Sequence, residues 1–226
     1  MGNGIFKNVK YLFECVMEVI YWGDEKCIIC KNDIYQEKCL CRNCNGKIRE
    51  CVDSSCLTYE NIKIKCYSSA YYSKTIRELV IKLKYKKDYK SAEVLSELML
   101  KVIERNSLEA DFITFVPVSR GTMKKRGYNQ SELLAKIICN EVEIKLIDSL
   151  KKVKDTKDQI GLGKKGRWEN IRNNFELRKN IDIQNKSFIL VDDVVTTGAT
   201  AFWCAYTLLK NGAGKVIVLT AAKSRV

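Results

Sequence analysis

Histidine is absent from this chain of 226 residues, and proline occurs only once. Without histidine the chain cannot hold a Ser-His-Asp triad, a Cys-His catalytic pair or a Cys₂His₂ zinc finger. A long uninterrupted apolar run is also missing near the N-terminus, because Lys7, Lys10, Glu14 and Glu18 interrupt the apolar segment 5–22. We therefore expect no secretory signal and no membrane insertion, and a cytoplasmic location. The apolar residues of this segment fall at helical spacing, which predicts an amphipathic packing helix.

The length and the charge of the chain limit the class of fold and the kind of partner that are expected. A hydrophobic fraction of 46% in 226 residues suffices for one α/β domain with a small appendage. The formal net charge of +13 fits a polyanionic partner, either nucleic acid or a pyrophosphorylated substrate. Solvated lysine faces account for the same charge equally well, so the charge alone does not decide between these interpretations.

The sequence divides into three zones: an N-terminal helix over 1–24, a cysteine-rich knuckle over 25–60 and an α/β domain over 61–226. In the third zone strand and helix patterns alternate, which predicts a parallel sheet flanked by helices. Ligands of such sheets bind beyond the carboxyl ends of the strands. The basic, weakly periodic segment 151–174 is expected to be a mobile loop or hood. The expected strands are 66–72, 112–118, 187–191 and 215–221, and the expected helices are 75–85, 92–104, 129–140 and 201–210.

Two CxxC pairs, Cys27 with Cys30 and Cys41 with Cys44, lie ten residues apart in the knuckle. Each pair can turn two thiolates toward one ion, so the spacing predicts a tetrahedral Cys₄ zinc site. This zone has little apolar core, and the metal would supply its folding energy. A redox CxxC is the alternative, but it needs a thioredoxin-like setting; unligated thiols are a third interpretation. The spacing leaves open whether another cysteine replaces a ligand: Cys39, Cys51, Cys56 or Cys66.

The most informative stretch is 188–200, FILVDDVVTTGAT. An apolar strand leads into two adjacent acids, then into a hydroxyl-rich turn and a helix. Turn amides, threonine hydroxyls and the helix dipole suit a phosphate, and the two carboxylates suit the ribose 2′- and 3′-hydroxyls. The alternative is a buried strand ending in a capped helix, but a cap needs only one acid and no run of hydroxyls. The residues of this predicted site are Asp192, Asp193, Thr196, Thr197, Gly198, Ala199 and Thr200.

This stretch resembles the PRPP-binding signature of type I phosphoribosyltransferases. Taken with the Cys₄ knuckle, Lys84-Tyr85, the loop at Pro117, the segment 126–131 and the pattern from Gln159 to Phe175, it resembles the ComF family of competence-associated proteins. The resemblance implies a type I phosphoribosyltransferase fold with an N-terminal zinc finger, and an association with DNA uptake and transformation. Ser119 departs from the family pattern, which often has proline there.

The resemblance also implies roles for the basic and polar residues between the knuckle and the 188–200 stretch. The loop after the expected strand 112–118 matches the pyrophosphate loop of the fold, and Lys84 suits a pyrophosphate oxygen as a point charge. A solvated basic face is the alternative for these cations. The predicted pyrophosphate-binding residues are Val118, Ser119, Arg120 and Lys84. The predicted cover over the sugar or acceptor consists of Arg126, Tyr128, Asn129 and Gln130.

The predicted function is that of a PRPP-binding, phosphoribosyltransferase-like protein with structural Zn²⁺ and with Mg²⁺ held mainly by the oxygens of PRPP. The acceptor is unknown, and the residues leave open whether the protein turns over. Purine-salvage relatives carry an acid four positions after the first acid of the pair, where this chain has Thr196. A purine acceptor is therefore less favoured, and no general base can be named. The alternative function is non-catalytic binding of single-stranded DNA by the knuckle and the basic face. DNA-uptake proteins are further expected partners.

Overall fold

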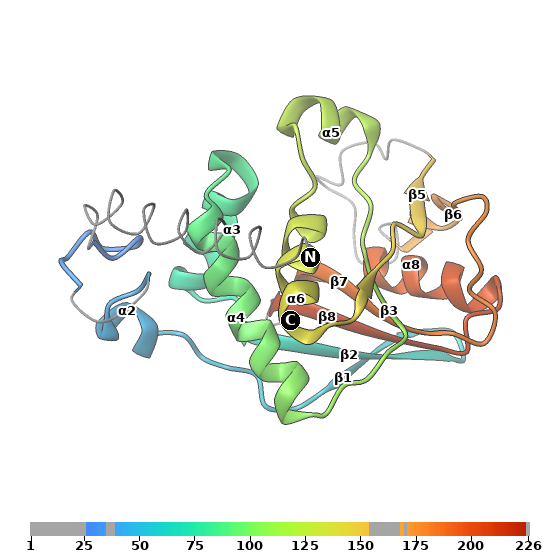
Figure 1. Cartoon of the computed structure of the whole chain (residues 1–226), viewed down its shortest axis with the longest axis horizontal. Helices are drawn as coiled ribbons and strands as arrows, with labels where there is room; N and C mark the ends of the chain where they lie inside the picture. Colours follow the sequence, from blue (N-terminus) through green and yellow to red (C-terminus); the bar gives the residue numbers. More distant parts are fainter. Residues whose placement is uncertain (1–25, 35–38, 154–167, 170, 225–226) are drawn as a thin grey trace, which may run out of the picture. The chain divides into compact units, whose positions relative to one another are not determined.

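A computed structural model of the chain describes residues 26–34, 39–153, 168–169 and 171–224 (Figure 1). The predicted helix over 1–24 lies outside the described residues, as does most of the predicted loop over 151–174. The chain forms two compact units, Met1–Gly46 and Lys47–Val226. Among the described residues, no helix has both the length and the apolar character needed to cross a membrane.

The described residues of the first unit form tight turns and one short helix, α2 (Arg42–Gly46). The Cys27 amide donates to the Asn32 carbonyl at 2.8 Å, and Lys31 adopts a left-handed conformation with φ 65°. These turns bring the two CxxC segments together without a regular strand. Among the described residues of this unit, the buried aliphatic side chains are Ile28, Ile34 and Leu40. These are too few to form a large core by themselves.

The second unit contains a six-stranded sheet with the strand order β1-β2-β8-β7-β3-β4. Every neighbouring pair is parallel except β1 with β2, which are antiparallel. The central strands carry continuous apolar runs, as expected for parallel strands covered on both faces. The strands are β1 (Ser55–Tyr59), β2 (Ile62–Tyr71), β3 (Phe112–Phe115), β4 (Lys145–Leu146), β7 (Ser187–Val195) and β8 (Lys215–Lys223).

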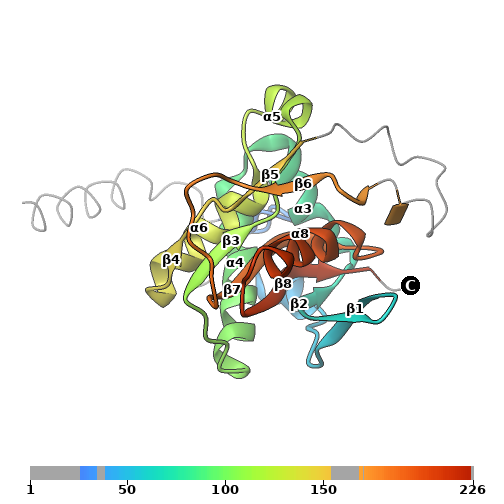
Figure 2. The ribbon, with the colours of Figure 1, turned by 90° about the vertical axis from the view of Figure 1, so that its right-hand side faces the viewer.

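Helices cover both faces of this sheet (Figure 2). On one face α4 packs on β2 and β8 while α6 packs on β3 and β7, and on the other face α8 packs on β7 and β8. The predicted fold class, a parallel sheet flanked by helices, is therefore confirmed, and the antiparallel edge strand β1 is the one difference within this sheet. The helices whose bounds are described in this unit are α3 (Lys74–Lys86), α4 (Tyr89–Arg105), α5 (Arg120–Arg126), α6 (Gln130–Val142) and α8 (Ala199–Lys210).

The structure differs from the sequence-based expectation at several element ends. β3 ends at Phe115 rather than at residue 118, because Pro117 has no amide hydrogen to donate to a neighbouring strand. β7 continues beyond Val191 to Val195, since β8 runs alongside and pairs Val194 with Ala222. The two acids of the 188–200 stretch therefore lie inside the strand, near its carboxyl end.

Several elements were not expected from the sequence, among them β4 and α2. β1 lies within the segment 25–60 that was assigned to the knuckle, yet it pairs with β2 in the sheet of the second unit. The short helix α5 follows β3. A two-stranded antiparallel ribbon, β5 (Leu150–Lys152) with β6 (Phe175–Leu177), joins the two ends of the predicted loop over 151–174.

Candidate functional site

A cavity of about 400 Å³ opens beyond the carboxyl ends of β3 and β7. It brings together most of the predicted site residues, although they come from four separate parts of the chain. Those that line it are Lys84, Val118, Ser119, Arg126, Gln130, Asp192, Asp193, Thr196, Thr197, Gly198, Ala199 and Thr200. Three predicted residues, Arg120, Tyr128 and Asn129, do not line it.

The turn between β7 and α8 depends on Gly198. This residue is the N-cap of α8 and has φ 81°, a left-handed conformation that glycine adopts without steric cost. A Cβ atom here would lie 2.7 Å from Cδ2 of Leu57 on β1, so glycine also permits close packing of the turn against that strand. The turn thus places the start of α8 at the cavity, where helix amides lack intrahelical acceptors. One of these amides, that of Ala199, donates to the Thr197 hydroxyl at 3.5 Å.

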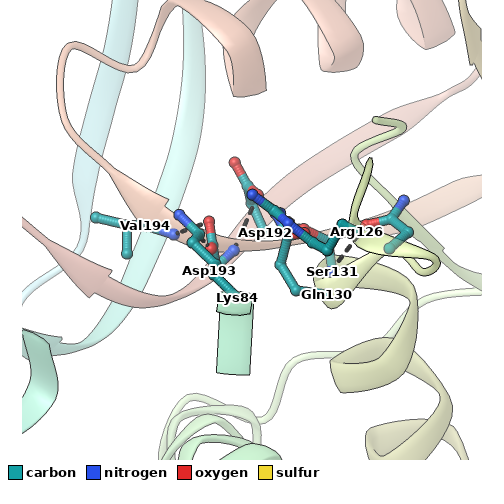
Figure 3. Close-up of polar contacts among 8 residues, drawn as sticks. Lys84, Arg126, Gln130, Ser131, Asp192, Asp193 and Val194 are labelled. Atoms are coloured by element: carbon teal, nitrogen blue, oxygen red, sulfur yellow. Dashed lines mark hydrogen bonds and ion pairs between the residues drawn. The ribbon is translucent and has the colours of Figure 1, made fainter. Parts of the chain in front are cut away.

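The two acids at the end of β7 are buried and held by hydrogen bonds (Figure 3). Oδ1 of Asp192 accepts hydrogen bonds from the Ser131 hydroxyl and from the Asp193 amide, each at 2.9 Å. Oδ1 of Asp193 accepts from the Val194 amide at 2.8 Å, and its Oδ2 lies 2.6 Å from Nζ of Lys84. Both carboxylates are therefore fixed in orientation before any ligand arrives.

Burial dominates the electrostatics of this pair. Burial raises the pKa of Asp192 to about 7, and the neighbouring charge of Asp193 adds to the rise, while the Ser131 hydroxyl and Lys84 oppose it. For Lys84, burial alone would lower the pKa, but the charge of Asp193 outweighs it and the pKa is raised. The cavity floor thus holds an ammonium ion and two acids, of which Asp192 titrates close to neutral pH.

The loop after β3 leads directly into α5. Ser119 is the N-cap of α5, and its hydroxyl accepts a hydrogen bond from the Thr122 amide at 3.1 Å. At the other end, the Arg126 guanidinium donates a hydrogen bond to Oε1 of Gln130, the first residue of α6 (Figure 3). Arg120 is exposed and lines an adjoining cavity of about 530 Å³ with Lys151, Lys152 and Arg178, among other residues. Ser119 and Lys152 line both cavities.

Asn129 and Ser131 support the site from within the fold. The Asn129 side chain is buried; it accepts from the Ser131 amide at 3.0 Å as the N-cap of α6 and donates to the Val116 carbonyl at 2.9 Å. It therefore ties α6 to the end of β3. Ser131 was not singled out from the sequence, and its position one residue after Gln130 gave no sign that it reaches Asp192.

Tyr128 lines a third cavity, between the end of α3 and α5. Its hydroxyl is buried and has no hydrogen-bond partner among the described residues. Burial raises the pKa of this hydroxyl, so it is a neutral donor at pH 7. Trp168, which also has a basic neighbour in the sequence, is buried and stacks on Tyr59 at a centroid distance of 5.2 Å.

The four predicted zinc ligands form a cluster in the first unit. The Sγ atoms of Cys27, Cys30, Cys41 and Cys44 all lie within 4.8 Å of one another. Tetrahedral zinc with Zn–S bonds of about 2.3 Å places its sulfur atoms roughly 3.8 Å apart, and the Cys30–Cys41 separation is 3.6 Å. The cluster therefore fits a Cys₄ metal site.

The remaining cysteines take no part in this cluster within the described part of the chain. Cys39 is buried in the same unit, whereas Cys51, Cys56 and Cys66 belong to the second unit, the last two on β1 and β2. Replacement of a predicted ligand by one of them is thus not needed to complete four sulfur atoms.

No protein-family model matches the chain. The chain is similar to DNA utilization protein YhgH of Escherichia coli strain K12, with 28% identity over 206 residues that cover 88% of this chain and 89% of the relative. It is also similar to Competence protein F of Haemophilus influenzae, with 26% identity over 223 residues that cover 88% of this chain and 97% of the relative. These two relatives confirm the predicted resemblance to the ComF competence-associated proteins.

Among solved structures, the chain is similar to adenine phosphoribosyltransferase from Thermoanaerobacter pseudethanolicus. The TM-score is 0.41 and the identity 15%, over 80% of this chain and 98% of the other. The fold class of this chain therefore rests on its own sheet topology, with helices on both faces.

Proposed function

We propose that the protein binds PRPP with Mg²⁺ in the 400 Å³ cavity and acts as a phosphoribosyltransferase-like protein of DNA uptake. The observation that carries this proposal is the pair Asp192 and Asp193, buried at the end of β7 beside the Gly198 turn and in one cavity with Lys84. The names of the relatives, a DNA utilization protein and a competence protein, support the biological context. The acceptor is unassigned.

The 5′-phosphate of PRPP would occupy the turn at the start of α8. This helix has twelve residues, enough for its aligned peptide dipoles to favour an anion at its N-terminus. The threonines around Gly198 add hydroxyl donors, and Thr196 is exposed toward solvent at the rim. A phosphate bound here would therefore be held by neutral donors rather than by cations.

The ribose hydroxyls would donate to Asp192 and Asp193. Both carboxylates retain acceptor capacity after the contacts described above, because an ionised carboxylate offers about four lone-pair positions. Ser131 and Lys84 hold the two groups in place, so little ordering is left to occur on binding. The sugar would in this way be positioned with its C1 atom toward the loop after β3.

The pyrophosphate would lie near Val118 and Ser119, with Lys84 contributing charge at the cavity floor. The donor set suits Mg²⁺, which prefers carboxylate, phosphate and water oxygens. Because Lys84 already pairs with Asp193, direct coordination by that carboxylate would compete with the ion pair. This favours the arrangement in which the ligand supplies most of the metal's oxygens.

Transfer to an acceptor would break the bond between C1 and pyrophosphate and form a bond from C1 to the acceptor, which loses a proton. The transition state would carry positive charge on the ribose ring, near the two buried carboxylates. No carboxylate other than Asp192 and Asp193 lines the cavity among the described residues. The proposal therefore assigns positioning and charge neutralisation to the chain, and assigns no general base.

Calorimetric titration of Mg²⁺-PRPP into zinc-loaded protein tests the proposal. We expect binding by the wild type and at least a tenfold loss in the Asp192→Asn, Asp193→Asn double variant. Asp111→Asn is the matched control, because Asp111 is an exposed aspartate outside the cavity. Failure of the wild type to bind at millimolar PRPP, or binding retained by the double variant, would refute the proposal.

Single-stranded DNA binding is a second candidate function. It is favoured by the relatives' names and by the cavity next to α5, where Arg120 lies with Lys151, Lys152 and Arg178. Fluorescence anisotropy of a labelled oligonucleotide should show affinity that falls steeply with salt, and Arg120→Ala should reduce the slope of log affinity against log salt by about one. Absence of binding at low salt would exclude this candidate.

A further inference from the structure

The cavity between the end of α3 and α5 is strongly cationic. It has a volume of about 590 Å³ and shares three lining residues, Lys84, Thr122 and Arg126, with the proposed PRPP cavity. Its lining contains no acidic residue. The full lining is Lys84, Tyr85, Lys87, Thr122, Lys124, Lys125, Arg126, Gly127 and Tyr128. Five of these nine residues are cations, so the cavity is electrostatically suited to an anion.

Three of the five cations make no ion pair with a described residue. Lys84 pairs with Asp193, and Arg126 bonds Gln130, but Lys87, Lys124 and Lys125 have no carboxylate partner among the described residues. The fold nevertheless brings them together: Gly127, at φ 82°, ends α5 so close to Lys87 that a Cβ atom would lie 3.2 Å from the Lys87 Nζ. Such a gathering of like charges is offset when an anion binds among them.

Two tyrosines, Tyr85 and Tyr128, also line the cavity. Tyr85 is 72% exposed, and the Arg126 guanidinium lies 5.6 Å from the centroid of its ring. The Tyr128 hydroxyl is buried in the same region without a hydrogen-bond partner among the described residues. An unsatisfied buried hydroxyl costs stability, so a ligand oxygen that accepts from it would gain affinity. An exposed aromatic face beside cations is the arrangement on which nucleobases stack.

We propose that this cavity is a second ligand site, distinct from the PRPP cavity, which binds a nucleoside monophosphate. The phosphate lies among Lys87, Lys124 and Lys125 and accepts a hydrogen bond from Tyr128, while the base stacks on Tyr85. The volume is within the usual range for small-molecule sites. Because Lys84 and Arg126 line both cavities, occupancy of one site changes the affinity of the other.

The test is calorimetric titration of AMP into wild-type protein that is saturated with Mg²⁺-PRPP. PRPP saturation blocks the turn at Gly198, where AMP would otherwise place its phosphate. We expect about one AMP to bind per chain, and adenosine, which lacks the phosphate, to bind at least tenfold more weakly. AMP that binds only PRPP-free protein, or that displaces PRPP competitively, would overturn the proposal.

Matched variants locate the site. Lys124→Ala with Lys125→Ala should weaken AMP binding at least tenfold and leave PRPP affinity within threefold. Lys86→Ala with Lys90→Ala is the control, because both lysines are exposed nearby but do not line the cavity. Equal losses of AMP affinity in the two double variants would mean that general surface charge attracts AMP, and would refute the site.

Tyr128→Phe distinguishes a role of the hydroxyl in AMP binding from a role in stabilising the fold. Because the hydroxyl has no described partner, its removal should leave the thermal midpoint of unfolding unchanged or raise it, while AMP affinity falls three- to tenfold. A lower midpoint together with unchanged AMP affinity would show that Tyr128 serves the fold alone, against the proposal.

The second site can be judged separately from the proposed PRPP function. If the wild type does not bind PRPP, AMP is titrated into free protein and into the Asp192→Asn, Asp193→Asn variant. Binding that depends on Lys124 and Lys125 but not on the aspartates would support the second site although the first proposal had failed. Binding lost in the aspartate variant would place AMP in the other cavity and refute the second site.

Discussion

The ammonium group of Lys84, near the end of α3, lies 2.6 Å from Oδ2 of Asp193, near the end of β7. The Lys84 side chain is 25% exposed and that of Asp193 only 5%, so water screens the ion pair mainly from the lysine side. From the sequence we expected Lys84 to contact pyrophosphate. The pair shows a second role for it, which is to compensate one of two adjacent buried acids.

Replacing Lys84 by methionine should therefore cost both stability and ligand affinity. The change leaves Asp193 as an uncompensated carboxylate beside Asp192, which we expect to lower the free energy of unfolding by about 2 kcal/mol. Urea denaturation measures this, and the Lys84→Met, Asp193→Asn double variant should recover much of the loss. The control is Lys82→Met, whose described ion-pair partner, Glu78, is 39% exposed and lies 3.7 Å away, against 5% and 2.6 Å for Asp193. Additive losses in the double variant would contradict coupling between Lys84 and Asp193.

The pKa of Asp192 predicts a specific dependence of stability on pH. The folded protein has a pKa of about 7 at this carboxyl, against about 4 for an unfolded aspartate, so between these values the folded state binds more protons. The free energy of unfolding should therefore fall as pH rises from 4 to 7, by at most about 4 kcal/mol from this group. Denaturation of wild type and Asp192→Asn at pH 5 and pH 8 should show a smaller fall in the variant. Identical falls would mean that Asp192 is ionised throughout.

Ser131→Ala tests how the carboxylate of Asp192 is held. The Ser131 hydroxyl donates to Oδ1 of Asp192 and opposes the rise of its pKa, so its removal should raise that pKa further. If ionised Asp192 accepts from a ribose hydroxyl, PRPP affinity increases with pH, and the midpoint of this increase should move upward in the variant. Titrations between pH 6 and pH 9 measure the midpoint. Ser96→Ala is a buried serine control on α4, away from the cavity. Weaker binding with an unmoved midpoint would indicate a packing role only.

The order of strand, turn and helix in the 188–200 stretch could be predicted because these elements are local, although the strand continues to Val195 instead of ending at Val191. A strand, two acids and a glycine turn are consecutive in the chain, and the helix after them begins at Ala199, two residues before the expected start. The knuckle is similarly local, since each CxxC spans four residues. The order of the strands in the sheet, by contrast, depends on pairing between distant segments.

The contacts that hold the two acids could not be predicted, because they join residues that are far apart in the sequence. Neither Lys84 nor Ser131 lies near Asp192 and Asp193 in sequence, and both reach them only because the fold places the end of α3 and the start of α6 next to the end of β7. β1 was not predicted, because its five residues, SCLTY, follow a cysteine-rich stretch and show only a weak alternation of polar and apolar side chains. The role of Asn129 as a helix cap was visible in principle, since asparagine before a helix is a strong N-cap signal.

The Cys₄ cluster predicts about one zinc ion per purified chain. Cys44→Ser removes a buried member of the cluster and should abolish stoichiometric zinc, measured by elemental analysis. Cys139→Ser is the control, because this half-buried cysteine on α6 belongs to the other unit. Chelation should also increase hydrogen exchange of the amides in residues 39–46, since metal ligation supplies the folding energy of such small units. Protein without zinc whose exchange in that range is unchanged would refute a structural metal.

Gly198→Ala should disrupt the turn that is proposed to hold the phosphate. Alanine at φ 81° is strained by about 1 to 2 kcal/mol, and its Cβ atom would lie 2.7 Å from Cδ2 of Leu57. We expect a comparable loss in the free energy of unfolding and at least a tenfold loss of PRPP affinity. Gly46→Ala is the matched control, because a Cβ atom there meets nothing within 4 Å. If steric contact with Leu57 contributes, adding Leu57→Ala should lower the free energy of unfolding less in the Gly198→Ala background than in the wild type. An equal loss in both backgrounds would assign the whole effect to backbone strain. A Gly198→Ala protein with unaltered stability and PRPP affinity would contradict both causes.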